Sequence, residues 1–170
     1  MEKLREFIST YKDHPKKGID FKDVLEIVQY PIIFKELIKK MAASEIIKNA
    51  DALISIDARG FIFGSAISFQ ASKPMIFARK PGKLPGELNK KNYNLEYGEN
   101  SLSIQKNSLK NHSSYAIVDD LLATGGTAEC VSNIARENNK RITGLVVVVE
   151  LGNLGGREKF KLPVESILKY

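Results

Sequence analysis

The residues best suited to chemistry lie together in the segment Tyr115–Thr127, YAIVDDLLATGGT. An apolar run ends in two adjacent carboxylates, Asp119 and Asp120, and a turn of small residues follows. Backbone N–H groups from Ala123 onward can approach an anion closely, because no bulky side chain covers them, and the positive end of a following helix would add to the attraction. The carboxylates can accept hydrogen bonds from sugar hydroxyls. The segment therefore predicts a site for a sugar phosphate.

Two common phosphate-binding patterns are absent from the sequence. It contains no G-x-x-x-x-G-K-[ST] of P-loop NTPases, and no G-x-G-x-x-G after a strand, which would indicate a dinucleotide site. The run Val118–Thr127 instead resembles the phosphoribosyl-diphosphate (PRPP) motif of the type I phosphoribosyltransferases, and Leu121-Leu122-Ala123 is similar to the adenine branch. The alternative interpretation is a plain helix N-terminus, with Asp as cap and Gly-Gly as turn.

A second motif, Asp57-Ala58-Arg59-Gly60-Phe61, follows an expected strand and begins an expected helix. Ligands gather at the carboxyl ends of strands in an open α/β sheet, so Arg59 can meet an anion there by bidentate hydrogen bonding. The motif resembles the diphosphate loop of the adenine branch, in which the peptide bond before the alanine is often cis. The resemblance implies a cis bond between Asp57 and Ala58 and diphosphate contacts from Asp57, Ala58 and Arg59. The alternative is a surface Asp–Arg pair at a helix start.

A third motif, Arg79–Pro85 (RKPGKLP), carries three cations beside proline and glycine. Taken alone, such a segment is a solvated basic turn. The resemblance implies that Arg79, Lys80 and Lys83 contact diphosphate, and that Arg79 reaches the active site of a neighbouring subunit.

The fourth motif, Tyr93–Gly98 (YNLEYG), ends a long polar loop that we expect over residues 79–98. A glutamate carried into a closed, dry site has the raised pKa that proton transfer near neutral pH requires. The motif resembles the adenine-branch lid, which implies that Glu96 manages the proton on purine N9 and that Tyr97 helps close the lid over the sugar phosphate. In isolation, a surface Glu beside a packing Tyr is the simpler interpretation.

The N-terminal segment Pro15–Asp23 resembles the hood that covers adenine in this family. The resemblance implies that Phe21 stacks on the base, and that backbone groups near Asp20 and Lys22 read its Watson–Crick edge. Three side chains depart from the usual pattern: His14 stands where Phe is usual, Asp20 replaces an aliphatic residue and Lys22 replaces Arg. These changes are tolerable if main-chain atoms carry the recognition.

Two further features carry no catalytic expectation. Neither His14 nor His112 has metal-ligand spacing. The segment Glu150–Arg157 resembles the family's C-terminal Glu-Leu…Leu-x-Gly-Arg sequence, for which we expect a structural role near the site.

The elements that must position these motifs follow from the apolar patterns. We expect strands at Ala52–Ile56, Pro74–Ala78, Ile117-Val118, Leu145–Val149 and Val164–Leu168, the last at an edge, and helices at Lys3–Tyr11, Tyr30–Lys48, Phe61–Ser72 and Gly126–Asn138. Their alternation predicts an α/β fold with an open, mostly parallel twisted sheet and helices on both faces, which matches the type I phosphoribosyltransferase fold that the resemblance implies. A chain of 170 residues fits one domain, with residues 1–30 as a small hood and residues 79–98 as a flexible lid.

Composition restricts the classes of protein and of partner. No apolar run approaches the ~20 residues that cross a bilayer, so we expect no membrane association. The single Cys130 permits no internal disulfide and favours a cytoplasmic protein. The net charge of +6 comes from dispersed Lys and Arg without a nucleic-acid-binding motif, so we expect a polyanionic small molecule rather than nucleic acid as the partner.

The resemblance covers residues from about Asp13 to Tyr170 and implies a purine-salvage glycosyltransferase. Adenine and PRPP would give AMP and diphosphate through an oxocarbenium-like transition state, in a homodimer, with Mg²⁺ held by PRPP and water rather than directly by protein. The residues implied as catalytic are Glu96, Asp119, Asp120 and Arg59, and those implied for the 5′-phosphate are Ala123, Thr124, Gly125, Gly126 and Thr127. Two alternatives stay open: a phosphoribosyltransferase for hypoxanthine, guanine or xanthine, and a non-catalytic regulator that senses PRPP or purine.

Overall fold

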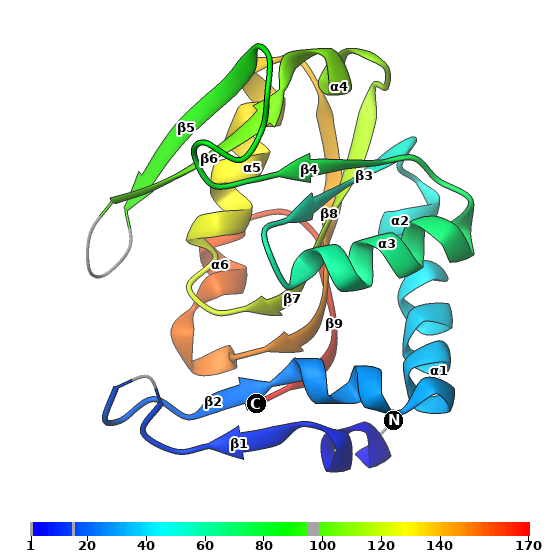
Figure 1. Ribbon diagram of the computed structural model, residues 1–170, viewed down its shortest axis with the longest axis vertical. Coiled ribbons are helices and arrows are strands. Elements are labelled where there is room, and N and C mark those ends of the chain that lie inside the picture. The colour runs from blue at the N-terminus through cyan, green and yellow to red at the C-terminus, as the bar shows by residue number, and fades with distance from the viewer. Residues whose placement is uncertain (1, 15, 95–98) are drawn as a thin grey trace.

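The computed structural model describes residues 2–14, 16–94 and 99–170, and its centre is a five-stranded sheet in the order β4-β3-β7-β8-β9 (Figure 1). Every neighbouring pair is parallel, so the expected open parallel sheet is confirmed. β9 lies at an edge, also as expected. The strands are β3 (Ala52–Ile56), β4 (Met75–Ala78), β7 (Ser114–Leu122), β8 (Arg141–Glu150) and β9 (Val164–Lys169).

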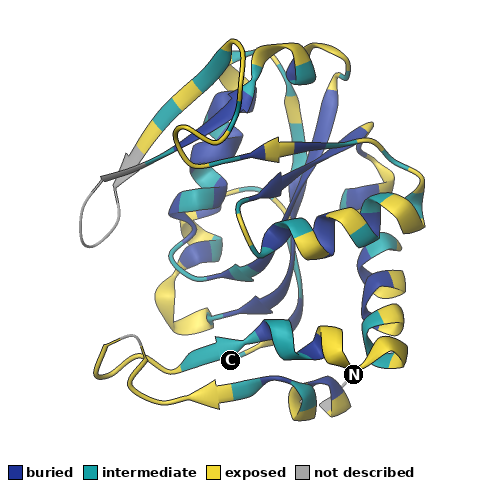
Figure 2. Ribbon diagram, viewed as in Figure 1, coloured by how far each residue is buried: buried dark blue, intermediate teal, exposed yellow. Residues whose placement is uncertain are grey.

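Helices cover both faces of this sheet. The α-helices are α1 (Pro31–Ala42), α2 (Glu45–Lys48), α3 (Gly60–Ala71), α4 (Lys106–Lys110), α5 (Gly126–Glu137) and α6 (Gly156–Phe160), and the 3₁₀ helices are η1 (Glu2–Phe7), η2 (Val24–Gln29) and η3 (Gly152–Leu154). Leu53 and Val118 pack into one core with α1 and α3, whereas their neighbours Ile54 and Ile117 pack into a second core with α5. Strands buried on both faces appear as continuous apolar runs, and the central strands are buried throughout most of their length (Figure 2).

The N-terminal segment forms a second, two-stranded antiparallel sheet below the main one in Figure 1, made of β1 (Ser9–Tyr11) and β2 (Phe21–Asp23). The helix expected over Lys3–Tyr11 is therefore wrong in its second half: η1 ends at Phe7 and a strand follows. Leu4 within η1 and Ile8 just after it are both buried without a continuing helix, and pairing with β2 decides the conformation of residues 9–11.

The polar segment after β4 forms an antiparallel hairpin of β5 (Leu88–Asn94) and β6 (Glu99–Gln105). The expectation of an irregular loop is wrong for Leu88–Asn94, which form β5. Leu102 and Ile104 of β6 are buried in the core on the α5 side of the sheet. The sequence of β5 is mostly polar, so it does not show the apolar pattern by which a strand is predicted. Glu96 and Tyr97 lie outside the described residues. Within the described ranges, no helix is long and apolar enough to cross a membrane.

Candidate active site

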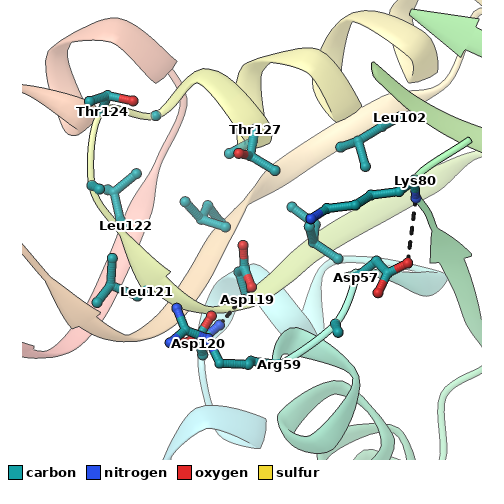
Figure 3. A pocket seen from close by; sticks show the side chains of 16 residues that line it. Asp57, Arg59, Lys80, Leu102, Asp119, Asp120, Leu121, Leu122, Thr124 and Thr127 are labelled. Carbon is teal, nitrogen blue, oxygen red and sulfur yellow. Dashed lines mark hydrogen bonds and ion pairs between the residues drawn. The ribbon is translucent and has the colours of Figure 1, made fainter. Parts of the chain in front are cut away.

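A cavity of about 300 Å³ lies where β3 and β7 end and the turns into α3 and α5 begin (Figure 3). This is the edge at which parallel α/β sheets collect ligands. Its lining includes Asp57, Ala58, Arg59, Lys80, Leu102, Asp119, Asp120, Leu121, Leu122, Ala123, Thr124, Gly125 and Thr127. Three of the four sequence motifs therefore meet in one hollow, although they are separated by up to 70 positions in the chain.

Two carboxylates form the floor of this cavity. Asp119 points into the open space, whereas Asp120 turns away toward Arg59, with 2.9 Å between Arg59 Nε and Asp120 Oδ2 (Figure 3). The backbone N–H of Asp120 donates a hydrogen bond to Asp119 Oδ1 at 2.9 Å. Burial, and secondly the negative charge of Asp120, raise the pKa of Asp119 well above its ordinary value. Burial also raises the pKa of Asp120, and the Arg59 guanidinium opposes that shift.

The turn from β3 into α3 carries the Asp-Ala-Arg-Gly motif. Its Asp57–Ala58 peptide bond is cis, which confirms the expectation from resemblance. A Cβ on Gly60 would lie 2.8 Å from Asp119 Oδ1, so only glycine lets α3 begin this close to the acid pair. Gly60 therefore helps to determine the geometry of the site. The sequence analysis included it in a motif but gave it no function.

The turn from β7 into α5 exposes unpaired donors. The first bond within α5 runs from Glu129 N to Gly125 O at 2.9 Å, so the N–H groups of residues 125–128 have no partner within the helix. Gly125 has φ +78°, a conformation that glycine adopts without strain. Thr124 and Thr127 place hydroxyl groups along the same turn. This arrangement can bind a phosphate at the N-terminus of α5.

The segment that begins α6 supports this turn from behind. A Cβ on Gly125 would lie 2.6 Å from Gly156 O, and a Cβ on Gly156 would lie 2.1 Å from Ala123 O. Backbone therefore packs on backbone at this point. The sequence offered a signal in the pair Gly155-Gly156, but their contact with the turn depends on tertiary packing.

Arg157 fixes that segment to the sheet. Its Nη2 and Nε donate to the two carboxylate oxygens of Glu150 at 2.6 and 2.9 Å, and Ser166 Oγ donates to the same carboxylate at 2.6 Å. Hydrogen bonds from Arg157 lower the pKa of the buried Glu150 to about 2. The structural role expected for Glu150–Arg157 fits these contacts.

The three cations after β4 have different positions. Lys80 lines the cavity and its backbone N–H lies 3.4 Å from Asp57 Oδ2. Arg79 pairs with the same carboxylate, with 3.2 Å between Arg79 Nε and Asp57 Oδ2. Lys83 is exposed and is not among the residues that line this cavity; its carbonyl accepts from Arg79 Nη1 at 3.3 Å.

The hood residues lie beside the acid pair rather than in the same cavity. The Phe21 ring is 5.3 Å from the Arg59 guanidinium and has the His14 ring edge-on at 5.2 Å. His14 thus supplies the aromatic contact at a position where the family usually has Phe. A second cavity, of about 620 Å³, lies between the hood and the turn at residues 123–127. Its lining includes Asp20, Lys22, Thr124, Leu151 and Tyr170.

Charged side chains near the cavity do not form a ready-made metal site. Among residues 2–14, 16–94 and 99–170, no group of three or more His, Cys, Asp and Glu side chains could hold a metal ion. The carboxylates of Asp57, Asp119 and Asp120 nonetheless supply the hard oxygen atoms that suit Mg²⁺ or the water bound to it.

Comparisons with known proteins agree with this geometry, although no protein-family model matches the chain. A curated protein of Prochlorococcus marinus (strain CCMP1986 / NIES-2087 / MED4), named adenine phosphoribosyltransferase, is 78% identical over 169 residues and is covered to 99%, as is this chain. One of the same name from Mycoplasmopsis pulmonis is 44% identical, with 98% of this chain and 97% of the relative covered. Two solved adenine phosphoribosyltransferases each have a TM-score of 0.92 and 34% identity: one from Thermoanaerobacter pseudethanolicus covers 99% of both chains, and one from Saccharomyces cerevisiae, in complex with adenine and an imino-altritol bisphosphate, covers 98% of this chain and 97% of that one.

Proposed function

This chain belongs to the adenine phosphoribosyltransferase family, and we propose that the cavity at the ends of β3 and β7 is where it transfers a phosphoribosyl group to adenine. The enzyme converts adenine to AMP in purine salvage. PRPP is the donor and diphosphate leaves. The observation that carries the assignment of the site is the meeting of the acid pair, the phosphate turn and Lys80 around one cavity of about 300 Å³.

Asp119 and Asp120 hold the ribose in this assignment. Breaking the bond between C1 and diphosphate leaves positive charge on the ribose ring, and a carboxylate beneath the ring stabilises that charge. The burial that raises the pKa of Asp119 disfavours its ionised form in the free protein. A developing cation above it reverses that preference, so the attraction is stronger in the transition state than in the ground state.

The phosphate turn, Ala123–Thr127, grips the 5′-phosphate through backbone N–H groups and the hydroxyls of Thr124 and Thr127. This contact lies away from the reacting carbon. Its binding energy therefore serves to orient the sugar over the acid pair.

The diphosphate lies at the opposite end, against Asp57, Ala58 and the cations of the segment after β4. Lys80 already lines this end, and Arg79 and Lys83 approach it from the exposed side. Mg²⁺ bound with PRPP would neutralise charge on the leaving group, and the carboxylates of Asp57, Asp119 and Asp120 would hold water bound to it rather than the ion itself. The carboxylates near the cavity accept hydrogen bonds from ribose hydroxyls or from metal-bound water.

Adenine occupies the space beside Phe21, with backbone groups at Asp20 and Lys22 reading its edge. Arg59 borders both regions, because its side chain contacts Asp120 and lies 5.3 Å from the Phe21 ring. Its orientation supports a place between ribose and base in addition to the diphosphate contact. Glu96 manages the proton on N9 and Tyr97 helps close the lid of residues 79–98, while residues 1–30 form the hood of a single domain spanning 1–170.

The proposed enzyme acts as a homodimer in the cytoplasm. Helix α3 contains no charged residue, and it leaves Phe69 90% and Ile62 39% exposed, next in the chain to the edge strand β4, where Phe77 is 40% exposed. A helix that is apolar all round is typical of one buried on every side. Arg79 lies 5.5 Å from the Phe61 ring, which contacts Phe77, so this surface is continuous with the diphosphate end and a partner could receive Arg79 there. The single thiol of Cys130 suits a reducing compartment.

Substrate-specific Michaelis constants test these roles. We expect Phe21→Ala to raise KM for adenine about 10-fold and Thr127→Val to raise KM for PRPP by a similar factor, because each removes a contact to one substrate. Phe21→Tyr and Thr127→Ser keep the ring and the hydroxyl and serve as controls. If Phe21→Ala changed only KM for PRPP, or Thr127→Val only KM for adenine, the assignment of the two ends would be wrong.

A further inference from the structure

The side chain of Tyr170 contacts two cations of the hood. Arg5 Cζ lies 4.5 Å and Lys22 Nζ 4.3 Å from the centre of the Tyr170 ring. A cation within about 6 Å of an aromatic ring centre is attracted by the ring quadrupole. Arg5 lies in η1 and Lys22 lies in β2, so one ring contacts two separate elements of the N-terminal segment.

The backbone of Tyr170 is fixed independently of the hood. Its N–H donates to Glu150 O at 2.9 Å, and its carbonyl accepts from Gly152 N at 2.9 Å. These bonds attach Tyr170 to the segment that leaves β8, which also carries Gly156 beneath the phosphate turn. The Tyr170 ring therefore joins the end of β8, to which its backbone is hydrogen-bonded, to the cations of the N-terminal segment.

The ring face, rather than the hydroxyl, makes the contacts. Tyr170 Oη is buried and has no hydrogen-bond partner among the residues that the structure describes. A buried hydroxyl without a partner costs free energy, so the hydroxyl does not explain why this side chain lies here. The two cation contacts do.

Lys22 links this contact to the base. Its ammonium group donates to Thr10 Oγ1 at 2.9 Å and lies on the Tyr170 ring, so its side chain faces the junction of hood and core. Its neighbour Phe21 contacts Arg59. Tyr170 and Lys22 also line the same cavity of about 620 Å³, together with Thr124 of the phosphate turn.

We infer that Tyr170 is a positioning residue for the base: its ring holds Arg5 and Lys22, and thereby sets the hood so that Phe21 stays opposite Arg59. This inference rests on the proposed binding of adenine beside Phe21. It also gives the lysine at position 22 a function, since a side chain engaged by Tyr170 leaves recognition of the base edge to the backbone.

The test compares three substitutions of Tyr170 in the full-length enzyme. Tyr170→Leu removes the quadrupole, and we expect it to raise KM for adenine about 10-fold while KM for PRPP and kcat stay within about twofold. Tyr170→Phe and Tyr170→Trp keep an aromatic face and are expected within about twofold of the wild type in every constant. An unchanged KM for adenine in Tyr170→Leu, or a Phe variant that behaves like the Leu variant, would overturn the inference.

Two further variants keep the result interpretable. Should Tyr170→Leu fail to fold, Arg5→Leu and Lys22→Met each remove one cation from an intact ring. Each is expected to raise KM for adenine by about threefold without a matching change in KM for PRPP, and unchanged values in both would contradict the clamp. Phe21→Ala separates the two proposals: if it leaves KM for adenine unchanged, the base site itself is wrong, whereas an effect there without one in Tyr170→Leu removes only the clamp.

Discussion

Asp119 is a single residue whose buried carboxyl affects both the stability of the fold and the proposed reaction. Its pKa is raised by burial, so the folded protein binds more protons than the unfolded chain between the ordinary aspartate pKa and the raised one. Stability from this group is therefore fully present below the ordinary pKa and falls as the pH rises through that window. Burial thus disfavours the ionised carboxylate in the free protein, and in the proposed reaction a ribose cation would favour it.

Replacing this carboxyl by an amide separates the two effects. We expect Asp119→Asn to raise Tm at pH 7 by roughly 2–4 °C, with the gain vanishing near pH 4, because the amide keeps its hydrogen bond and loses only the charge. The same change should lower kcat/KM about 100-fold, since the transition state loses its counter-charge. Thermal unfolding across pH and steady-state kinetics measure both. Glu36→Gln on the exposed face of α1 is the control; a destabilised but fully active Asp119→Asn would refute this role.

The contribution of Gly156 is steric rather than electrostatic. A Cβ at this position would lie 2.1 Å from Ala123 O and 2.9 Å from Leu122 Cδ1. We expect Gly156→Ala to displace the phosphate turn and to raise KM for PRPP at least 10-fold, with KM for adenine changed much less. Gly152→Ala is the matched control, because its Cβ would meet only Tyr170 O at 3.5 Å, an ordinary contact. Equal effects of the two variants would count against a specific support of the turn.

The sequence predicted the site residues where a motif kept them contiguous. Asp119, Asp120, Ala123, Thr124, Gly125 and Thr127 line one cavity, because a buried strand, a turn and a helix follow one another directly; Gly126 of the same motif is not in that lining. Gly156 and Tyr170 could not be predicted in this way. Their contacts join β8, β9 and the hood, and such contacts follow from tertiary packing.

Between elements, the Glu150–Arg157 pair connects β8 to α6. The pKa of Glu150 is lowered to about 2, so the stability from this pair is present above the ordinary value of 4.5 and is lost as the pH falls toward 2. We expect Glu150→Gln to lower the free energy of unfolding at pH 7 by about 1–3 kcal/mol and to flatten the pH dependence between 4.5 and 2. Urea unfolding at several pH values measures this. Glu45→Gln, whose carboxylate pairs on the surface with Lys48, should leave that slope unchanged, and an equally steep slope in Glu150→Gln would contradict the assignment.

The main strands and helices were predictable because the central sheet is buried on both of its faces. β3 and β8 are apolar along most of their length since helices cover both faces of the sheet, and α5 begins where the small residues end. β1 and β5 were missed for the opposite reason. Their sequences, Ser9–Tyr11 and Leu88–Asn94, are mostly polar, and their strand conformation comes from pairing with a partner strand.

At the scale of the whole molecule, the apolar surface of α3 predicts a dimer. We expect the wild type to have twice the 19.0 kDa mass of the chain by light scattering, and Phe69→Lys to shift it toward the single-chain mass with impaired activity. Phe69 is 90% exposed in one chain, so the substitution removes no contact within the fold. Ile32→Lys, at a 78% exposed residue of α1, is the matched control. A wild type that is monomeric and fully active would exclude the proposed dimer.

Base specificity can be measured as diphosphate release from PRPP and Mg²⁺ with adenine, hypoxanthine, guanine and xanthine in separate reactions. We expect release with adenine, and with each other base at a rate lower by at least about 100-fold, because the proposed hydrogen bonds from the hood backbone would match only the adenine edge. Comparable release with another base would contradict the proposal that the hood recognises adenine. The contacts of Phe21 with His14 and Arg59 would then serve a base of either kind. Absence of release with every base would show that this cavity is not a phosphoribosyl-transfer site.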